Sequence, residues 1–260
     1  MLLRSLSVLI KPLRYFLFSL LLTTFMLSML GCSSNESEEE KERLSEQQYY
    51  EAAHQAIEAN NYLLAIENLT EIESRFPFGR YAIQAQLDLI FSYYKSIDYE
   101  AALLQADRFI RQHPEHPDID YVYYMKGLSS YSTDRGFIAR ILPSAPSERD
   151  VSAAKLAFSE LSRFIAKYPS STYAQDARQR MIYLRNVIAE HELHVADYYI
   201  ERRAYLAAAN RARYVVENLP NAPVIPKALG IMSKSYRALG MIDLAENAEK
   251  ILKEHFPKQP

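Results

Sequence analysis

Five proline-terminated segments recur along this chain, and they constrain its fold more than any other feature of the sequence. The segments SRFP, RQHP, AKYP, ENLP and EHFP end at Pro77, Pro114, Pro169, Pro220 and Pro257. An alanine stands twelve residues before each proline, at Ala65, Ala102, Ala157, Ala208 and Ala245. Two antiparallel helices approach closely only where one presents a small side chain, and proline ends a helix because it lacks the amide donor. The pattern therefore predicts five helix pairs.

The spacing of these segments indicates a helical repeat with two insertions. Successive prolines lie 37, 55, 51 and 37 residues apart, against a period of about 34 for tetratricopeptide repeats. In three repeats a tyrosine precedes the alanine by nine residues, as in the tetratricopeptide pattern: Tyr93, Tyr199 and Tyr236. The first long gap places an insertion at 132–149, between the helices of the third repeat. The second long gap extends the first helix of the fourth repeat, predicted at 173–200.

The fold class that we predict is an all-α tetratricopeptide-repeat superhelical solenoid of five helix pairs. Apolar residues recur at spacings of three and four, and the chain has no run of alternating β-branched residues. The predicted pairs are 46–59 with 62–75, 81–96 with 99–112, 119–131 with 150–167, 173–200 with 204–217, and 225–239 with 242–255. The predicted repeats are 45–78, 79–117, 118–171, 172–222 and 223–260. In such an array each repeat packs on its neighbours, so residues 45–260 form one folding unit.

The N-terminal residues have the pattern of a lipoprotein signal peptide. Arg4, Lys11 and Arg14 precede an apolar run over 15–30, which is short for a membrane-spanning helix. The following residues, LSMLGC, resemble a lipobox that ends at Cys32. In a lipobox the cysteine is acylated and becomes the first residue of the mature protein. We therefore expect the protein to be lipid-anchored.

Cys32 is the only cysteine, so no intramolecular disulfide is possible and lipid attachment is its expected role. The signal peptide is predicted at 1–31, and a lipidated flexible tether with five glutamates at 32–44. Ser33, in place of aspartate at the second mature position, indicates release to the outer membrane of a Gram-negative cell. Beyond the covalent N-acyl and S-diacylglycerol lipid, we expect no cofactor.

Charge and motifs argue against nucleic-acid binding and against catalysis. Removal of the signal peptide takes the net charge from −2 to −5, which does not suit nucleic acid. The chain contains no GxGxxG, P-loop, GxSxG or HExxH motif. His191 and His194, beside Glu190 and Glu192, could ligate a metal, but a third ligand is not evident and a solvated charged face is the preferred interpretation. We therefore predict no metal site and no enzyme.

Two groups of residues are candidates for protein binding. The first helix of a tetratricopeptide repeat lines the concave face, and counting from the consensus places five residues there: Tyr50, His54, Gln84, Phe91 and Tyr94. Exposed aromatic side chains anchor peptides well, although packing against the neighbouring repeat would also explain them. Arginines concentrate in the fourth repeat, as a candidate surface for docking a partner: Arg202, Arg203, Arg211 and Arg213.

Long stretches of the chain resemble one family. RFPFGRYAIQAQLDLIFSYYK (75–95), ADRFIRQHPEHPDIDYVYYMKGL (106–128) and VADYYIERRAYLAAANRARYV (195–215) are similar to the BamD family of the outer-membrane β-barrel assembly machinery. The resemblance implies a periplasmic scaffold, lipid-anchored at the outer membrane, that docks onto the barrel-forming subunit BamA and binds accessory lipoproteins. It also implies that the N-terminal repeats recognise the C-terminal strand signal of unfolded outer-membrane proteins.

Two other functions remain as alternatives at this point. Other outer-membrane tetratricopeptide lipoproteins scaffold cell-wall hydrolases, and periodicity alone does not separate that role from barrel assembly. An enzyme with a metal at His191 and His194 is the second alternative. The partner that co-purifies with the protein would separate the two scaffolds, and metal analysis would test the enzyme.

Overall fold

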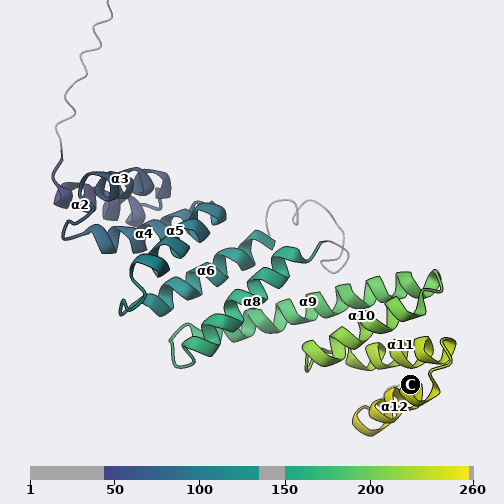
Figure 1. Cartoon of the computed structure of the whole chain (residues 1–260). Coiled ribbons are helices and arrows are strands. Elements are labelled where there is room, and N and C mark those ends of the chain that lie inside the picture. Colours follow the sequence, from purple (N-terminus) through teal and green to yellow (C-terminus); the bar gives the residue numbers. More distant parts are fainter. Residues whose placement is uncertain (1–43, 135–149, 258–260) are drawn as a thin grey trace, which may run out of the picture. The chain divides into compact units, whose positions relative to one another are not determined.

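The computed structural model of the protein describes residues 44–134 and 150–257. The signal peptide, Cys32, most of the predicted tether and most of the 132–149 insertion lie outside the described residues. The described residues form ten α-helices and no strand (Figure 1). The helices are α2 (Glu46–Glu58), α3 (Tyr62–Arg75), α4 (Ala82–Lys95), α5 (Tyr99–Gln112), α6 (Ile119–Asp134), α8 (Ser152–Lys167), α9 (Ala174–Glu201), α10 (Tyr205–Asn218), α11 (Ile225–Ala238) and α12 (Ile242–His255).

The helices pack as five consecutive pairs, as the repeat pattern predicts. Each helix packs against the next one in the chain, and α4 with α6, α6 with α9, and α9 with α11 are also in contact. These additional contacts join the first helices of neighbouring repeats. The five repeat alanines are all completely buried, because they stand where the two helices of a pair cross most closely. The predicted all-α array of helix pairs is thus confirmed.

The turns inside four of the five repeats, the first, second, fourth and fifth, use one backbone position in the same way. Asn60, Ile97, Arg203 and Gly240 all have positive φ, between 58° and 73°, and each stands five residues before its repeat alanine. The positive φ reverses the chain between two antiparallel helices. Glycine and asparagine adopt it easily, whereas a β-branched residue such as Ile97 is strained there.

The first two repeats are joined by a contact that requires glycine. The carboxylate of Glu46, the first residue of α2, accepts hydrogen bonds from the backbone N–H groups of Arg80 (3.1 Å) and Tyr81 (2.6 Å), just before α4. A Cβ atom at Gly79 would collide with that carboxylate. The RFPFGRY segment therefore forms an anion-accepting turn that ties α2 to the next repeat.

Two helices differ from the regular repeat length. The α6 helix continues to Asp134, past the predicted end at residue 131 and into the predicted insertion. The α9 helix has 28 residues, twice the length of most others, and matches the predicted 173–200 within one residue. Because α9 has no internal glycine or proline, nothing in its sequence ends the helix at the usual point.

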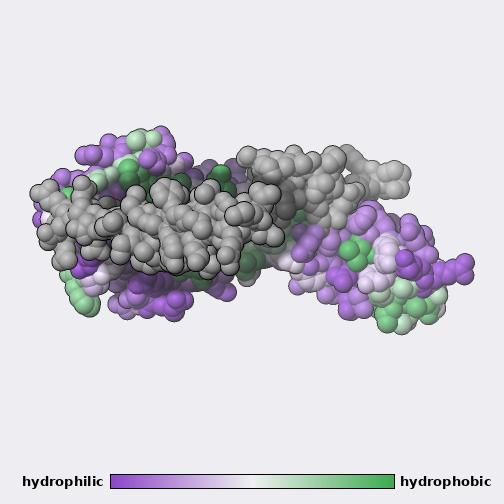
Figure 2. Space-filling view, turned by 90° about the horizontal axis from the view of Figure 1, so that it is seen from above, coloured by the Kyte–Doolittle hydropathy of each residue, from purple (hydrophilic) through white to green (hydrophobic). Residues whose placement is uncertain are grey.

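The hydrophobic core is divided along the array. The largest cluster extends from α4 to α11, and a smaller one joins α2, α3 and α4 through buried residues such as Leu69, Ile72 and Leu89. On the face shown in Figure 2, the described surface is mainly hydrophilic, with separate hydrophobic patches. Among the residues that the structure describes, no helix is both long and apolar enough to span a membrane.

Candidate functional site

Three of the five predicted peptide-binding residues meet around a carboxylate that the sequence did not single out. Asp88 of α4 accepts a hydrogen bond from Gln84 Nε2 (3.0 Å), and His54 Nε2 of α2 lies 3.1 Å from its second oxygen. Tyr50 stacks on Tyr81, with ring centroids 4.4 Å apart, and also contacts the ring of His54. Tyr50 and His54 therefore pack against the neighbouring repeat, the alternative that the sequence left open.

Burial controls the electrostatics of this group. It raises the pKa of Asp88 above its usual value, and the hydrogen bonds from Gln84 and His54 offset only part of the effect. Burial and the nearby carboxylate also raise the pKa of Tyr50 to about 12. The group is therefore a polar site around one carboxylate, Asp88, that ionises less readily than usual. The donors that bond to this carboxylate carry no permanent charge.

The other two residues of this set, Phe91 and Tyr94, lie further along α4. The Phe91 ring meets the Tyr62 ring edge-on at 6.1 Å, and the Lys95 ammonium lies over both rings at 5.9 and 5.5 Å. Tyr94 packs against Tyr99 of α5, with centroids 5.6 Å apart. Gln84, Asp88, Phe91 and Lys95 follow one stripe of α4 at helical spacing, whereas Tyr94 is directed towards α5.

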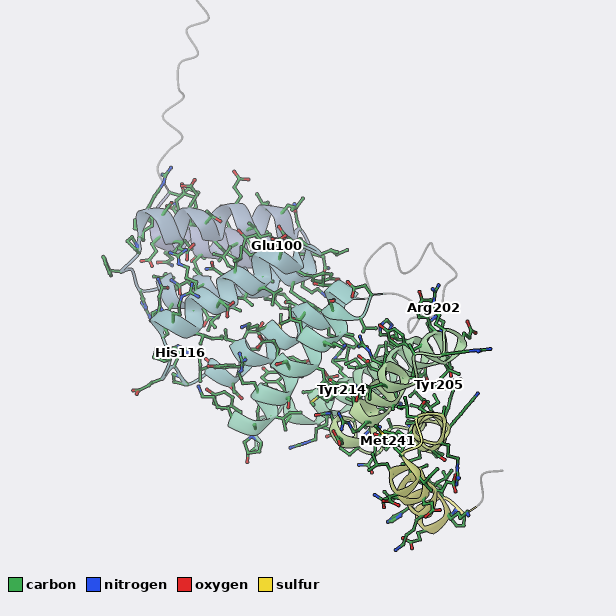
Figure 3. All side chains as sticks on the ribbon, turned by 45° about the vertical axis from the view of Figure 1, so that its right-hand side comes forward. Glu100, His116, Arg202, Tyr205, Tyr214 and Met241 are labelled. Atoms are coloured by element: carbon green, nitrogen blue, oxygen red, sulfur yellow. The ribbon has the colours of Figure 1, made fainter. Side chains whose placement is uncertain are left out.

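The four arginines of the fourth repeat do not form one patch. Arg202 and Arg203 are exposed in the α9–α10 turn, and Arg202 covers the Tyr198 ring at 4.4 Å. Arg211 and Arg213 are two residues apart on α10 and therefore point about 200° apart around its axis. In Figure 3, Arg202 lies at the turn, well away from Tyr214 on the side of α10 nearer to α8.

Arg211 pairs with the buried carboxylate of Glu192, whose burial the sequence pattern did not predict. Glu192 was expected on a solvated face, but it is only 2% exposed. Its two carboxylate oxygens lie 2.7 Å from Lys155 Nζ of α8 and 2.9 Å from Arg211 Nη1 of α10. Burial alone would raise the pKa of Glu192, but hydrogen bonds from the two cations outweigh it and the pKa is lowered. The sequence gives no signal for this cluster, because its members are 19 and 37 residues from Glu192.

Histidine clusters in the described residues do not assemble into a metal centre. The structure brings no three His, Cys, Asp or Glu side chains together there in a way that could hold an ion. His194 is exposed, and His113 and His116 both pack against the ring of Phe109 at 4.9 and 5.4 Å. The contacts at His113 and His116 make them part of the turn between the second and third repeats.

Comparison with known proteins gives consistent matches over almost the whole chain. A family model described as "YfiO: Outer membrane lipoprotein" matches residues 42–251. The "Outer membrane protein assembly factor BamD" of Vibrio cholerae is 37% identical over 224 residues, which cover 86% of this chain and 92% of that protein. The proteins of the same name from Neisseria meningitidis (serogroup A) and Xylella fastidiosa (strain Temecula1) are each 33% identical, over 93% and 94% of this chain and 92% and 83% of their own lengths.

Proposed function

Since this chain belongs to the family of outer membrane lipoproteins that includes the BamD assembly factors, we propose that it is a non-enzymatic scaffold for assembling β-barrel proteins into the outer membrane. The observation that carries this proposal is the 37% identity to an assembly factor along 92% of that protein's length. The fold supports it, because an array of helix pairs offers long surfaces for several protein partners at once.

The partners that we propose are the barrel-forming subunit BamA, accessory lipoproteins and the C-terminal strand signal of unfolded substrates. The strand signal is assigned to the region of α2 and α4 that carries the predicted peptide-binding residues: Tyr50, His54, Gln84, Phe91 and Tyr94. Docking of BamA is assigned to the fourth repeat, where Arg202 and Arg203 are exposed and make no ion pair within the described chain. Arginine in such a position is suited to pairing with carboxylates of a partner.

Localisation completes the proposal. We place the protein at the periplasmic face of the outer membrane, held by acyl chains on Cys32. Two or three acyl chains anchor a protein stably where one does not, because each buried methylene contributes about 0.8 kcal/mol. Cys32→Ser should leave the repeats folded and abolish both acyl labelling and membrane attachment. An unlabelled parent protein, or a serine variant that stays in the outer membrane without its protein partners, would contradict the anchor.

One purification tests the scaffold role directly. The tagged protein is purified from detergent-solubilised envelopes, and co-purification of the barrel-forming subunit is the expected result. Recovery of a cell-wall hydrolase in its place would favour a hydrolase scaffold and overturn the proposal.

Two double variants test the assignment of surfaces. Phe91→Ala with Tyr94→Ala should weaken binding of an aromatic strand-signal peptide about tenfold, or about 1.4 kcal/mol, and leave BamA docking intact. Arg202→Glu with Arg203→Glu should do the converse. Arg211 is left unchanged because reversing its charge would place a second carboxylate against Glu192. Loss of both activities in each folded variant would mean one shared surface.

A further inference from the structure

A groove between α8 and α10 lies outside both candidate surfaces. It forms a cavity of about 510 Å³, within the usual range of about 300–1,000 Å³ for ligand-binding pockets. Ile188 of α9 lies among its lining residues together with Phe158 and Leu219, and Tyr214 of α10 is exposed beside them. The groove exists because α9 is long enough for α8 and α10 to pack along the same part of it: Lys155 and Arg211 both reach Glu192.

The charged residues that line the groove, among those that the structure describes, are all cations. They are Lys155 and Arg163, both on α8, and Ser159 and Ser162 stand between them. The two cationic side chains are 42% and 57% exposed, so both remain accessible. On a protein with a net charge of −2, this is a local surface of the opposite sign.

Each of these cations is held by a buried glutamate that a second cation shares. The Glu192 carboxylate pairs with both Lys155 and Arg211, so two cations share one buried acid at that end. At the other end Glu160 lies 3.3 Å from Arg163 and 3.2 Å from Lys126, and Lys126 also pairs with Asp107 at 2.7 Å. The two ion-pair clusters thus fix the positions of the cations along α8.

The spacing of the two cations suits an extended chain. Eight residues separate them on α8, or about 12 Å along the helix axis. In a β-strand, residues i, i+2 and i+4 face one side, and positions i and i+4 are about 13 Å apart. Two acidic residues at i and i+4 would therefore meet Lys155 and Arg163, and the residue between them would face Phe158 and Ile188. A second cavity of about 370 Å³ shares Ser162 and Ala166 with the first and continues the groove towards Arg178.

We propose that the α8–α10 groove binds an extended segment of a partner polypeptide that carries two acidic residues four positions apart with an aromatic or apolar residue between them. Serine hydroxyls along α8 supply hydrogen-bond partners for the backbone of such a segment, and Tyr214, whose ring lies 5.8 Å from Lys155 Nζ, forms an aromatic wall. The groove adjoins Arg211 but contains none of the residues assigned to the other two surfaces.

The test uses labelled peptides, so its result is independent of whether the protein assembles barrels. The probe is a capped fluorescent peptide with the core Glu-Ser-Tyr-Ser-Glu. One control replaces both glutamates with glutamine, and a second, Glu-Ser-Tyr-Glu-Ser, keeps the composition but puts the two charges on opposite faces of a strand. Fluorescence anisotropy should show the probe binding at least about tenfold more tightly than either control at low salt, with the advantage shrinking as salt rises.

Three variants locate the site. Arg163→Gln, which removes the charge without placing a second carboxylate against Glu160, should weaken probe binding at least about tenfold, and Ser162→Trp should do the same by filling the groove without a change of charge. Lys234→Gln, at an exposed residue of α11 away from the groove, makes the same charge change as Arg163→Gln and should leave binding within about twofold. Circular dichroism confirms that each variant is folded. Equal binding of the glutamate and glutamine peptides, equal losses in Arg163→Gln and Lys234→Gln, or unchanged binding by Ser162→Trp would overturn the proposal.

Discussion

Two carboxylates, one in the second repeat and one in the fourth, make the most informative contrast in this molecule. Asp88 and Glu192 both lie on the first helix of a repeat, and both are largely shielded from solvent by neighbouring helices. The partners of Asp88 are a histidine, an amide and a tyrosine, and its pKa is raised. The partners of Glu192 are a lysine and an arginine, and its pKa is lowered.

The contrast shows that the partners, and not burial alone, decide what a buried acid does. Around Asp88 no permanent positive charge from the described residues compensates the carboxylate, so the contacts of α2 with α4 at this point consist of aromatic stacking and hydrogen bonds from uncharged donors. Around Glu192 two permanent cations bring α8, α9 and α10 together. We expect the N-terminal interface to tolerate loss of its donors and the later one to fail when its cations are removed.

The largest expected effect comes from removing those cations. Lys155→Ala with Arg211→Ala leaves Glu192 buried without a cation, which should cost about 3–5 kcal/mol in the free energy of unfolding. The matched pair His54→Ala with Gln84→Ala should cost less than half as much, because neither of the removed donors carries a permanent charge. Urea denaturation measures both. Similar losses in the two double variants would remove the distinction between the interfaces.

Overpacking the repeat alanines tests whether the two regions differ in packing as well as in charge. Ala102 and Ala208 are both completely buried, and replacing either with leucine should cost about 1–3 kcal/mol. Ala101→Leu and Ala207→Leu, one position earlier on the same helices and only half-buried, are the matched controls and should cost less. A large difference between Ala102→Leu and Ala208→Leu in thermal unfolding would show that packing also separates the two regions.

A smaller effect is expected at the turns inside the repeats. Ile97 has φ 70° and is 70% exposed, so glycine there should relieve strain and stabilise the protein by about 0.5–1 kcal/mol. Gly240, at the same position of repeat five, has φ 73°, and a Cβ atom added there would meet no described atom within 4 Å. Gly240→Ala should therefore destabilise by about 1 kcal/mol through the backbone alone. If Ile97→Gly also destabilises in thermal unfolding, the isoleucine side chain makes a contact that outweighs its strain.

The smallest effects concern pH, and they have opposite signs. The lowered pKa of Glu192 makes its contribution to stability complete above its ordinary value of 4.5, and that contribution is lost as pH falls through the folded-state pKa. The raised pKa of Asp88 makes its contribution favourable below its ordinary value of 3.8, and that contribution is lost as pH rises through the folded-state pKa. Unfolding curves measured across this pH range should show that Glu192→Gln no longer loses that stability as the pH falls. Those of Asp88→Asn should show that it no longer loses its contribution as the pH rises. Identical pH profiles for parent and variants would refute both assignments.

Most of the fold could be predicted because its signals are local. The spacing of alanine and proline, together with the apolar period, placed the helices within one to three residues, because both depend on neighbours three or four positions away. The end of α6 was missed because no glycine or proline stands between residues 131 and 134. The resemblance at 75–128 and 195–215 pointed to the family that the comparisons then showed.

The candidate sites could be predicted only as residue types on faces. Counting from the repeat consensus placed Tyr50, His54 and Gln84 on one face. It did not reveal Asp88, with which all three interact. It also grouped four arginines that the structure separates.

What the sequence by itself determined is the repeating helix pair and its approximate bounds. What only the tertiary structure decided is which charges are buried and with whom they pair. Glu192 and Lys155 are 37 residues apart in the chain, and the length of α9 sets which of its turns α8 and α10 both cover. Helix periodicity is a property of a few consecutive residues, whereas the partner of a buried charge depends on how three helices meet, and no local pattern encodes that meeting.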